Sequence, residues 1–326
     1  MDDLTSGLSI GVVGLGLMGT SIAVALLIAG HPVVAIAPLA HELDKAPDEI
    51  RKQLEQCHAA GLLQGSTQDD CIDRLTVSHD YAALAGCRMV LECVTESLDI
   101  KKQVYQYITE AVTPATVITT NTSAIPISIL QSHVPHPGRF LGMHWAEPAY
   151  MTRFLEITCG AQTDPHHAQW AFNLATRWGK EPTLLKKDIR GFVTNRLMYA
   201  VYREALTLAD RGEATVEDMD KVFRYDAGSW MTMMGVFRRL DYMGLDSLQP
   251  IFKEIFPQLS NTARVPPPMQ RLIDLKAKGV PTGSGFYDYP GEEGADWMQA
   301  FARFNEDIDR LAAGYPSGKP GGHDLH

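Results

Sequence analysis

Residues 10–19 read Ile-Gly-Val-Val-Gly-Leu-Gly-Leu-Met-Gly, and they are the most informative part of the sequence about its fold. The apolar run Leu8–Val13 predicts a short strand, which leads directly into the spacing G-x-G-x-x-G. A helical pattern of apolar residues follows over 18–29, and Val33–Ala37 predicts a second strand. A strand, a glycine turn, a helix and a second strand within about 30 residues predict a dinucleotide-binding site of the Rossmann type.

Each glycine of the motif has its own physical role. Gly14 permits the tight turn, Gly16 lets the backbone approach a pyrophosphate, and Gly19 lets the helix pack close to the strand. The start of the helix, at Leu17 and Met18, presents free N–H groups to the phosphates. We therefore expect these five residues to bind the cofactor.

The second strand lacks the acidic residue that usually holds the adenosine ribose. That acid normally ends the strand about 20 residues after the glycines and binds the 2′-hydroxyl. Here the strand ends in Ala37 and Pro38, and no arginine follows closely that could accept a 2′-phosphate, although His41 and Lys45 are near. NAD is the expected cofactor, and NADP is not excluded because Ala37 replaces the acid.

Length and composition indicate an ordinary globular protein of two domains. The chain has 326 residues, of which 45% are hydrophobic and 21% charged, and this length exceeds what one core usually holds. A net charge of −10 argues against nucleic acid or an anionic membrane as the main partner.

Membrane spans, secretion and metal binding are not expected. No apolar run reaches the roughly 18 residues of a membrane span. The start Met1-Asp2-Asp3 is acidic where a signal peptide is basic. The five cysteines show no Cys-x-x-Cys spacing, so we expect reduced thiols in a cytoplasmic protein and no zinc site.

One glycine and four polar residues each follow a predicted strand. Gly14, Glu96, Asn121, Ser123 and His144 each come just after a short apolar run. In an open parallel sheet, ligands bind at the edge formed by the carboxyl ends of the strands. Strands alternating with helices over residues 8–185 predict an α/β domain with a largely parallel sheet, so these five residues should share that edge.

His144 and Glu156 are the candidates for proton transfer. His144 should sit where a strand around 139–141 ends, and Glu156 lies in the alternating run 154–157 beyond the turn at Pro148. Two strands joined by a turn can bring an imidazole and a carboxylate face to face. A histidine oriented by a carboxylate is the usual means of moving a proton near neutral pH.

The second half of the chain is predicted to be helical. A long helix is expected from Phe192 to Asp210, Thr215 should cap the next, and further helices are expected around 231–242, 245–255 and 267–278. We therefore predict a Rossmann-type domain over 1–188, an all-helical substrate and dimerisation domain over 189–313, and a disordered tail over 314–326.

With these motifs in place, the chain resembles the L-3-hydroxyacyl-CoA dehydrogenase family over nearly its whole length. The marks in the first half are Gly14-Leu15-Gly16-Leu17-Met18-Gly19, Glu96 with Lys101, Asn121-Thr122-Ser123, and Gly142-Met143-His144 with Glu156. The marks in the second half are Gly191-Phe192-Val193-Thr194-Asn195, Gly235-Val236-Phe237 with Asp241, and Gly283-Ser284-Gly285-Phe286-Tyr287.

The resemblance implies hydride transfer between a 3-hydroxyacyl-CoA and NAD, as in fatty acid metabolism, by a homodimer that pairs through the helical domain. It implies that His144 is the general base and that Glu156 orients it. Ser123 and Asn195 would hydrogen-bond the reacting oxygen or the neighbouring thioester. It also implies that Glu96, Lys101 and Asn121 lie along the nicotinamide ribose.

The chain departs from the family pattern beside the histidine. The family more often has an aromatic pair and then Asn, where this chain has Trp145, Ala146 and Glu147. Related branches act on free hydroxy acids such as L-carnitine or L-gulonate with the same His and Glu. A free hydroxy acid therefore stands as the alternative substrate.

Two further alternatives are weighed against this resemblance. The 3-hydroxyisobutyrate and 6-phosphogluconate type of dehydrogenase opens with a similar glycine motif but uses a lysine in Gly-x-x-x-Lys-x-x-Asn, and here the matching segment reads Gly191-x-x-x-Asn195. A non-catalytic NAD(H)-binding structural protein would not need Ser123, His144, Glu156 and Asn195 together.

Overall fold

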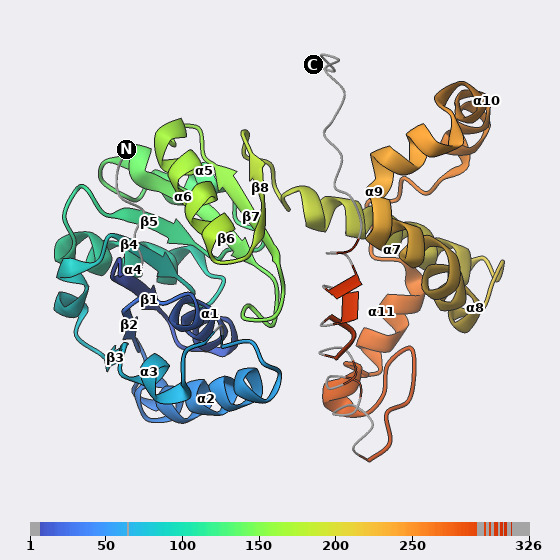
Figure 1. Cartoon of the computed structure of the whole chain (residues 1–326). Coiled ribbons are helices and arrows are strands. Elements are labelled where there is room, and N and C mark those ends of the chain that lie inside the picture. The colour runs from blue at the N-terminus through green and yellow to red at the C-terminus, as the bar shows by residue number, and fades with distance from the viewer. Residues whose placement is uncertain are drawn as a thin grey trace. The chain divides into compact units, whose positions relative to one another are not determined.

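A computed structural model of the chain divides into two compact units, residues 1–195 and 196–326 (Figure 1). It describes residues 7–63, 65–291, 297, 300, 303–305, 307–308, 310–311 and 314. Apart from Gly314, the predicted tail lies outside these described residues. Within the described part, no helix is both long and apolar enough to span a bilayer.

The first unit is built on one eight-stranded sheet in the order β3-β2-β1-β4-β5-β6-β7-β8. The strands are β1 (Ile10–Val13), β2 (Val33–Ile36), β3 (Leu75–Ser78), β4 (Met89–Glu92), β5 (Val117–Thr120), β6 (Phe140–Trp145), β7 (Phe154–Cys159) and β8 (Glu181–Leu185). Six of the seven pairings are parallel, and only β6 with β7 is antiparallel. The predicted largely parallel sheet is confirmed.

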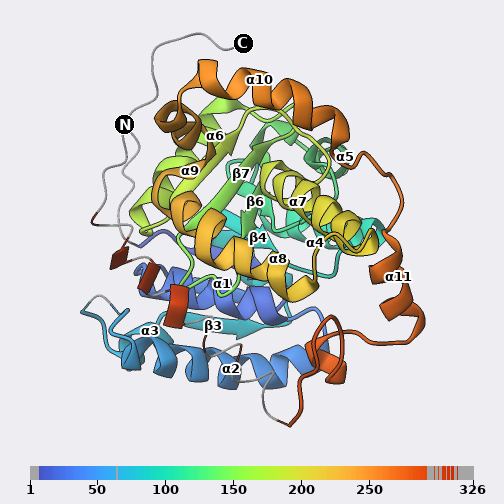
Figure 2. The same ribbon diagram turned by 90° about the vertical axis from the view of Figure 1, so that its right-hand side faces the viewer.

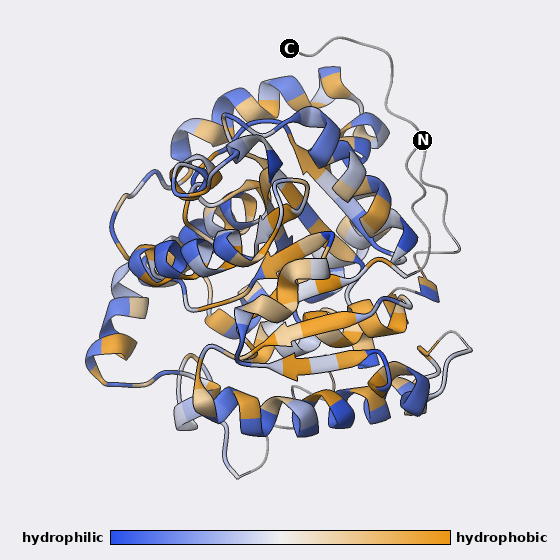
Figure 3. Ribbon diagram, turned by 90° about the vertical axis from the view of Figure 1, so that its left-hand side faces the viewer, coloured by the Kyte–Doolittle hydropathy of each residue, from blue (hydrophilic) through white to orange (hydrophobic). Residues whose placement is uncertain are grey.

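Helices cover both faces of this sheet (Figure 2). They are α1 (Leu17–Ile28), α2 (Ala40–Ala59), α3 (Gln68–Ile72), α4 (Leu98–Ala111), α5 (Ile127–Gln131) and α6 (Pro165–Arg177), with short 3₁₀ turns at Tyr81–Gly86 and Pro137–Arg139. One core cluster joins the sheet to α1, α2 and α6, and a second joins it to α4 and α5. The central strands are apolar along their length, as expected for a sheet covered on both sides, whereas α2, at the bottom of Figure 3, alternates apolar and polar residues.

The second unit is helical. It contains most of α7 (Val193–Asp210), then α8 (Val216–Val222), a π-helical turn (Phe223–Ala227), α9 (Gly228–Met243), α10 (Leu245–Ile255), a 3₁₀ turn (Phe256–Gln258), α11 (Pro267–Asp274) and a last 3₁₀ turn (Val280–Thr282). The hydroxyl of Thr215 caps α8 as predicted, by accepting a hydrogen bond from the Asp218 N–H at 3.0 Å. Gly235, with φ of 68°, interrupts α9.

Some sequence-based details were wrong. The strand β6 runs on to Trp145, so His144 lies within it and not at its end. The strands β3 and β8 were not anticipated.

Candidate active site

The glycine turn after β1 has the shape that a dinucleotide needs. Gly14 has φ of +93°, and a Cβ on Gly19 would lie 1.8 Å from the Gly14 carbonyl oxygen, so neither position accepts a side chain. A Cβ on Gly16 would meet open space. The first turn of α1 holds no acidic residue, and no side chain of the described residues caps it, so its first N–H groups are available to an anion. The turn therefore fits a pyrophosphate.

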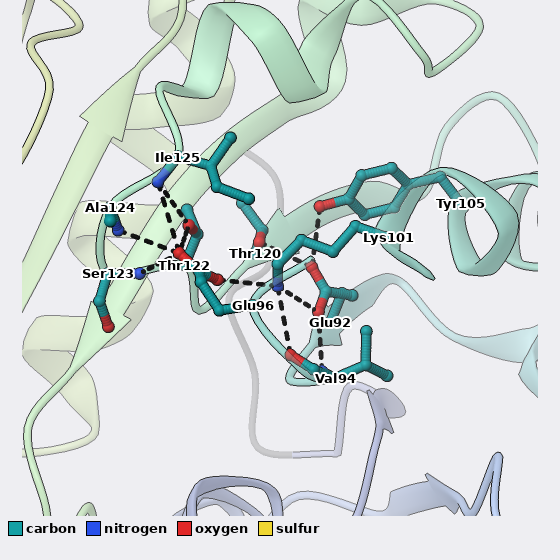
Figure 4. A network of polar contacts seen from close by, with 10 residues as sticks. All are labelled: Glu92, Val94, Glu96, Lys101, Tyr105, Thr120, Thr122, Ser123, Ala124 and Ile125. Carbon is teal, nitrogen blue, oxygen red and sulfur yellow. Dashed lines mark hydrogen bonds and ion pairs between the residues drawn. The ribbon is translucent and has the colours of Figure 1, made fainter. Parts of the chain in front are cut away.

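A buried carboxylate, Glu92, ends β4 beside this turn. Its side chain is fully buried and accepts four hydrogen bonds: from the Val94 N–H, the Lys101 ammonium, the Tyr105 hydroxyl and the Thr120 hydroxyl, at 2.7 to 2.8 Å (Figure 4). Burial and the Glu92 charge raise the pKa of Tyr105 well above its ordinary value, which keeps this phenol a donor. Glu92 was missed from the sequence, although a carboxylate that ends an otherwise apolar strand was a signal.

Lys101 joins Glu92 to Glu96. Its side chain is 1% exposed, and its Nζ lies 2.7 Å from Glu92, 3.4 Å from Glu96 and 3.3 Å from the Val94 carbonyl (Figure 4). The ammonium therefore contacts the protein on three sides. Burial by itself would raise the pKa of Glu96, but the Thr122 hydrogen bond and the Lys101 charge outweigh it, and the pKa lies below its ordinary value.

Glu96 holds the turn that carries Ser123. Its Oε1 accepts hydrogen bonds from the Thr122 hydroxyl and from the N–H groups of Ser123, Ala124 and Ile125, the last three at 3.0 to 3.4 Å. The Asn195 side chain donates to the Ser123 carbonyl at 2.9 Å. The main chain of Ser123 is thus held on both sides, while its exposed hydroxyl has no partner among the described residues.

Asn121 ties the turn after β5 to β6. Its backbone N–H donates to the Glu92 carbonyl at 2.8 Å, and its side-chain oxygen accepts from the Trp145 N–H at 2.9 Å. Asn121 therefore fixes the backbone next to His144.

His144 and Glu156 face each other across the antiparallel pair β6–β7, in direct register. The His144 Nδ1 lies 3.4 Å from the Glu156 Oε2, and Glu156 is 1% exposed whereas the His144 side chain is 15% exposed. Val193 and Thr194 are the first residues of α7, and their N–H groups donate to the other Glu156 oxygen at 3.1 and 3.3 Å. The Glu156 carboxylate therefore accepts hydrogen bonds from the start of a helix, where free N–H groups favour such an acceptor.

This geometry decides which nitrogen of His144 is available. Because Nδ1 faces a carboxylate, the proton of the neutral ring belongs there, and Nε2 is left to accept a proton from a ligand. Phe192 lies against the ring, with ring centroids 5.7 Å apart, and adopts φ of 48°, an uncommon conformation for a bulky side chain. Strain beside a reactive group is frequent at functional sites.

The segment after β6 is anchored by Ser21 and Lys180, which the sequence did not single out. Ser21 of α1 accepts from the Ala149 N–H at 2.7 Å, and Lys180 donates to the carbonyls of Ala149 and Thr152. Trp145, which directly follows His144, stacks on Trp178 at 5.6 Å. These contacts join the histidine strand to the helix of the glycine motif.

The sheet order, the glycine turn and the free start of α1 define a dinucleotide-binding domain of the Rossmann type. More narrowly, the chain belongs to the 3-hydroxyacyl-CoA dehydrogenase family: residues 9–189 match the family's NAD-binding domain, and residues 191–289 match its C-terminal domain. The family expected from the sequence motifs is confirmed.

Relatives with different names resemble the chain at similar identity. A 5-formyl-3-hydroxy-2-methylpyridine 4-carboxylate 5-dehydrogenase of Mesorhizobium japonicum is 31% identical over 288 residues, which cover 87% of this chain and 92% of the relative. A 3-hydroxybutyryl-CoA dehydrogenase of Mycobacterium tuberculosis is 30% identical over 282 residues, which cover 86% and 98%.

Solved structures of these two kinds of relative differ in their TM-scores to this chain. The structure of a 5-formyl-3-hydroxy-2-methylpyridine 4-carboxylic acid 5-dehydrogenase, an NAD⁺-dependent dismutase, matches with a TM-score of 0.88 at 29% identity, over 94% of this chain and 99% of the other. The (S)-3-hydroxybutyryl-CoA dehydrogenase of Ralstonia eutropha matches with a TM-score of 0.73 at 25% identity, over 87% and 99%.

Proposed function

We propose that the chain oxidises the 3-hydroxyl of an L-3-hydroxyacyl-CoA with NAD, and that His144 is the general base. The observation that carries this proposal is the His144–Glu156 pair, in which Glu156 is buried and bound by the start of α7. When bound, NAD supplies the hydride acceptor. His144 Nε2 takes the hydroxyl proton, and Glu156 balances the charge that then appears on the imidazole.

The remaining site residues orient the ligands in this proposal. The free Ser123 hydroxyl hydrogen-bonds the reacting oxygen. Asn195 holds Ser123 in place by donating a hydrogen bond to the Ser123 carbonyl. The glycine turn and the first residues of α1 bind the pyrophosphate. Lys101 acts through Glu96, because its ammonium is already surrounded by protein atoms.

A compact carboxylated substrate is the second candidate. It is favoured by the TM-score of 0.88 to the pyridine carboxylate dehydrogenase and by the unusual Trp145-Ala146-Glu147 beside the base. The family resemblance places part of the CoA contacts in the region of α2. That helix carries five carboxylates and only three Lys or Arg side chains, a poor match for the phosphates of CoA.

A substrate comparison tests the proposal. NADH formation is measured with L-3-hydroxybutyryl-CoA, with the free acids L-carnitine and L-gulonate, and with 5-formyl-3-hydroxy-2-methylpyridine 4-carboxylate, at equal enzyme and NAD. Turnover of the thioester alone supports the acyl-CoA assignment. Turnover of a free acid or of the pyridine compound instead supports the second candidate and contradicts the first.

We also propose that the helical unit pairs with a second copy of the chain. Among its described residues only Leu248 is buried, whereas Phe237 and Tyr242 are 81% and 75% exposed. Side chains of α7, α8 and α11 line an apolar cavity of about 540 Å³. Exposed apolar surface on this scale is typical of an association face.

A further inference from the structure

The exposed turn between β5 and α5 is held by a single carboxylate oxygen. Three consecutive backbone N–H groups of this turn point at Glu96 Oε1 at 3.0 to 3.4 Å (Figure 4). They belong to Ser123, Ala124 and Ile125. The Thr122 hydroxyl donates to the same oxygen. Without Glu96 these backbone donors would be left to water, and the turn would lose its one shared anchor.

The backbone of Ser123 is bonded on both sides. Its N–H donates to Glu96, and its carbonyl accepts from the Asn195 side chain at 2.9 Å. Because both groups are engaged, the direction of the Cα–Cβ bond is fixed, and the side chain retains only its rotation about that bond. The Ser123 hydroxyl has no partner among the described residues, so it is left free for a ligand.

The hydrogen-bonding capacity of Glu96 and Lys101 is spent mostly on the protein. Glu96 Oε1 has two lone pairs and already receives four donors, while Oε2 faces the Lys101 ammonium at 3.4 Å. The three N–H groups of Lys101 meet three acceptors, namely Glu92, Glu96 and the Val94 carbonyl. Lys101 therefore has no donor left for a ribose hydroxyl, and Glu96 Oε1 accepts no further hydrogen bond.

We propose that Glu96 is a positioning residue of the substrate site, which holds Ser123 where its hydroxyl meets the reacting oxygen. The inference rests on the role proposed above for Ser123. Lys101 orients Glu96 by binding Oε2, so that Oε1 faces the turn. Displacement of a positioning group by about 1 Å can cost on the order of 10²-fold in rate. A ligand of the nicotinamide ribose, the role implied by the family resemblance, would instead act on NADH binding.

A double-mutant cycle separates these two roles. We measure kcat, on whichever substrate turns over, and the Kd of NADH for wild type, Glu96→Ala, Ser123→Ala and the double variant. Glu96→Ala should lower kcat about tenfold or more and leave the Kd of NADH unchanged. In the Ser123→Ala background it should cause little further loss, because the group that it positions is already absent.

Two more variants complete the set. Glu96→Gln keeps an acceptor oxygen at the same place and should recover part of the kcat that Glu96→Ala loses. Asp99→Asn removes a carboxylate from the first turn of α4, where the Asp99 side chain is 94% exposed, and should change neither kcat nor the Kd of NADH.

The possible failures of the proposal differ from one another. If Glu96→Ala lowers kcat by the same factor with and without the Ser123 hydroxyl, its effect is a general loss of structure and the proposal is overturned. A rise in the Kd of NADH in Glu96→Ala also overturns it, in favour of a ribose ligand. If Ser123→Ala alone leaves kcat unchanged, the role of Ser123 in the proposed function fails, and the inference falls with it.

Discussion

Glu156 links His144 to the helix that follows the sheet. One oxygen faces His144 across the β6–β7 pair, and the other accepts the N–H groups of Val193 and Thr194. The position of the imidazole therefore depends on the start of α7 as well as on the strands. A carboxylate with donors on both oxygens is held in one orientation, which is what a general base needs from its neighbour.

The His144–Glu156 pair was predictable from the sequence because His144 follows a short apolar run and Glu156 lies in an alternating run beyond one turn. The Val193 contact was not, because it joins Glu156 to a residue 37 positions away. Glu92 was missed for a similar reason: its four donors come from a loop, a helix and a neighbouring strand, and only the fold brings them together.

His31 provides a prediction about pH. Its Nε2 accepts a hydrogen bond from the Trp178 indole at 2.8 Å, and its Nδ1 lies 3.1 Å from the Leu8 carbonyl. Burial lowers the pKa of His31 below 6.5, although the Leu8 carbonyl partly opposes this. The fold therefore prefers the neutral ring, and this part of the stability is present above 6.5 and lost as the pH falls through the lowered pKa.

We expect the free energy of unfolding of the wild type to fall more than that of His31→Gln between about pH 7 and pH 5. Urea unfolding followed by tryptophan fluorescence measures both proteins. Glutamine does not titrate, so groups such as His167 contribute equally to the two curves. Parallel curves would show that His31 is not the source of the acid sensitivity.

The loops beyond β4 and β5 form one hydrogen-bonded unit. Glu92, Lys101 and Glu96 connect the end of β4, the helix α4 and the turn at Thr122 to Ile125 (Figure 4). Because a buried ion pair is costly to break, this network keeps the edge of the sheet rigid where the nicotinamide end of NAD is expected.

Lys101→Met should destabilise the protein by about 3–5 kcal/mol, since it leaves Glu92 as an uncompensated buried charge. Adding Glu92→Gln removes that charge and should recover part of the loss. Urea unfolding of the single and double variants measures this, with the exposed Lys102→Met as control. If the double variant is less stable than Lys101→Met alone, the charge pairing proposed here is wrong.

The two edge strands are among the elements that the sequence did not predict. The strands β3 and β8 lie at the ends of the sheet order, and their side chains are mostly half-buried or exposed. An edge strand needs no continuous apolar run and tolerates Pro182, so periodicity alone does not distinguish it from a loop. The central strands, which are buried on both faces, were recognised readily.

The two units differ in how far their apolar side chains are buried. The sheet unit buries its core between two layers of helices, whereas Phe237, Tyr242 and Leu275 of the helical unit are at least 75% exposed. Helix positions in this unit were predictable from periodicity. What covers its apolar surface could not be predicted from one chain, because a partner surface leaves the same periodic pattern as an internal core.

Replacing Phe237 and Tyr242 together by Asp should dissociate the proposed dimer. Charges at the centre of an apolar interface are not compensated, so the association should weaken by orders of magnitude. Analytical ultracentrifugation of wild type and variant measures the change, with Glu254→Lys as control. A wild type that sediments as a monomer at all concentrations contradicts the proposed pairing.

We propose that His144 takes the substrate proton while NAD takes the hydride. The most direct measurement compares His144→Ala with wild type in kcat for NADH formation, on whichever substrate of the comparison turns over, and in the Kd of NADH. We expect a fall in kcat of about 10²-fold or more, the scale of lost acid–base catalysis, with NADH affinity unchanged. A variant that keeps most of its kcat while binding NADH normally would show that another group accepts the proton.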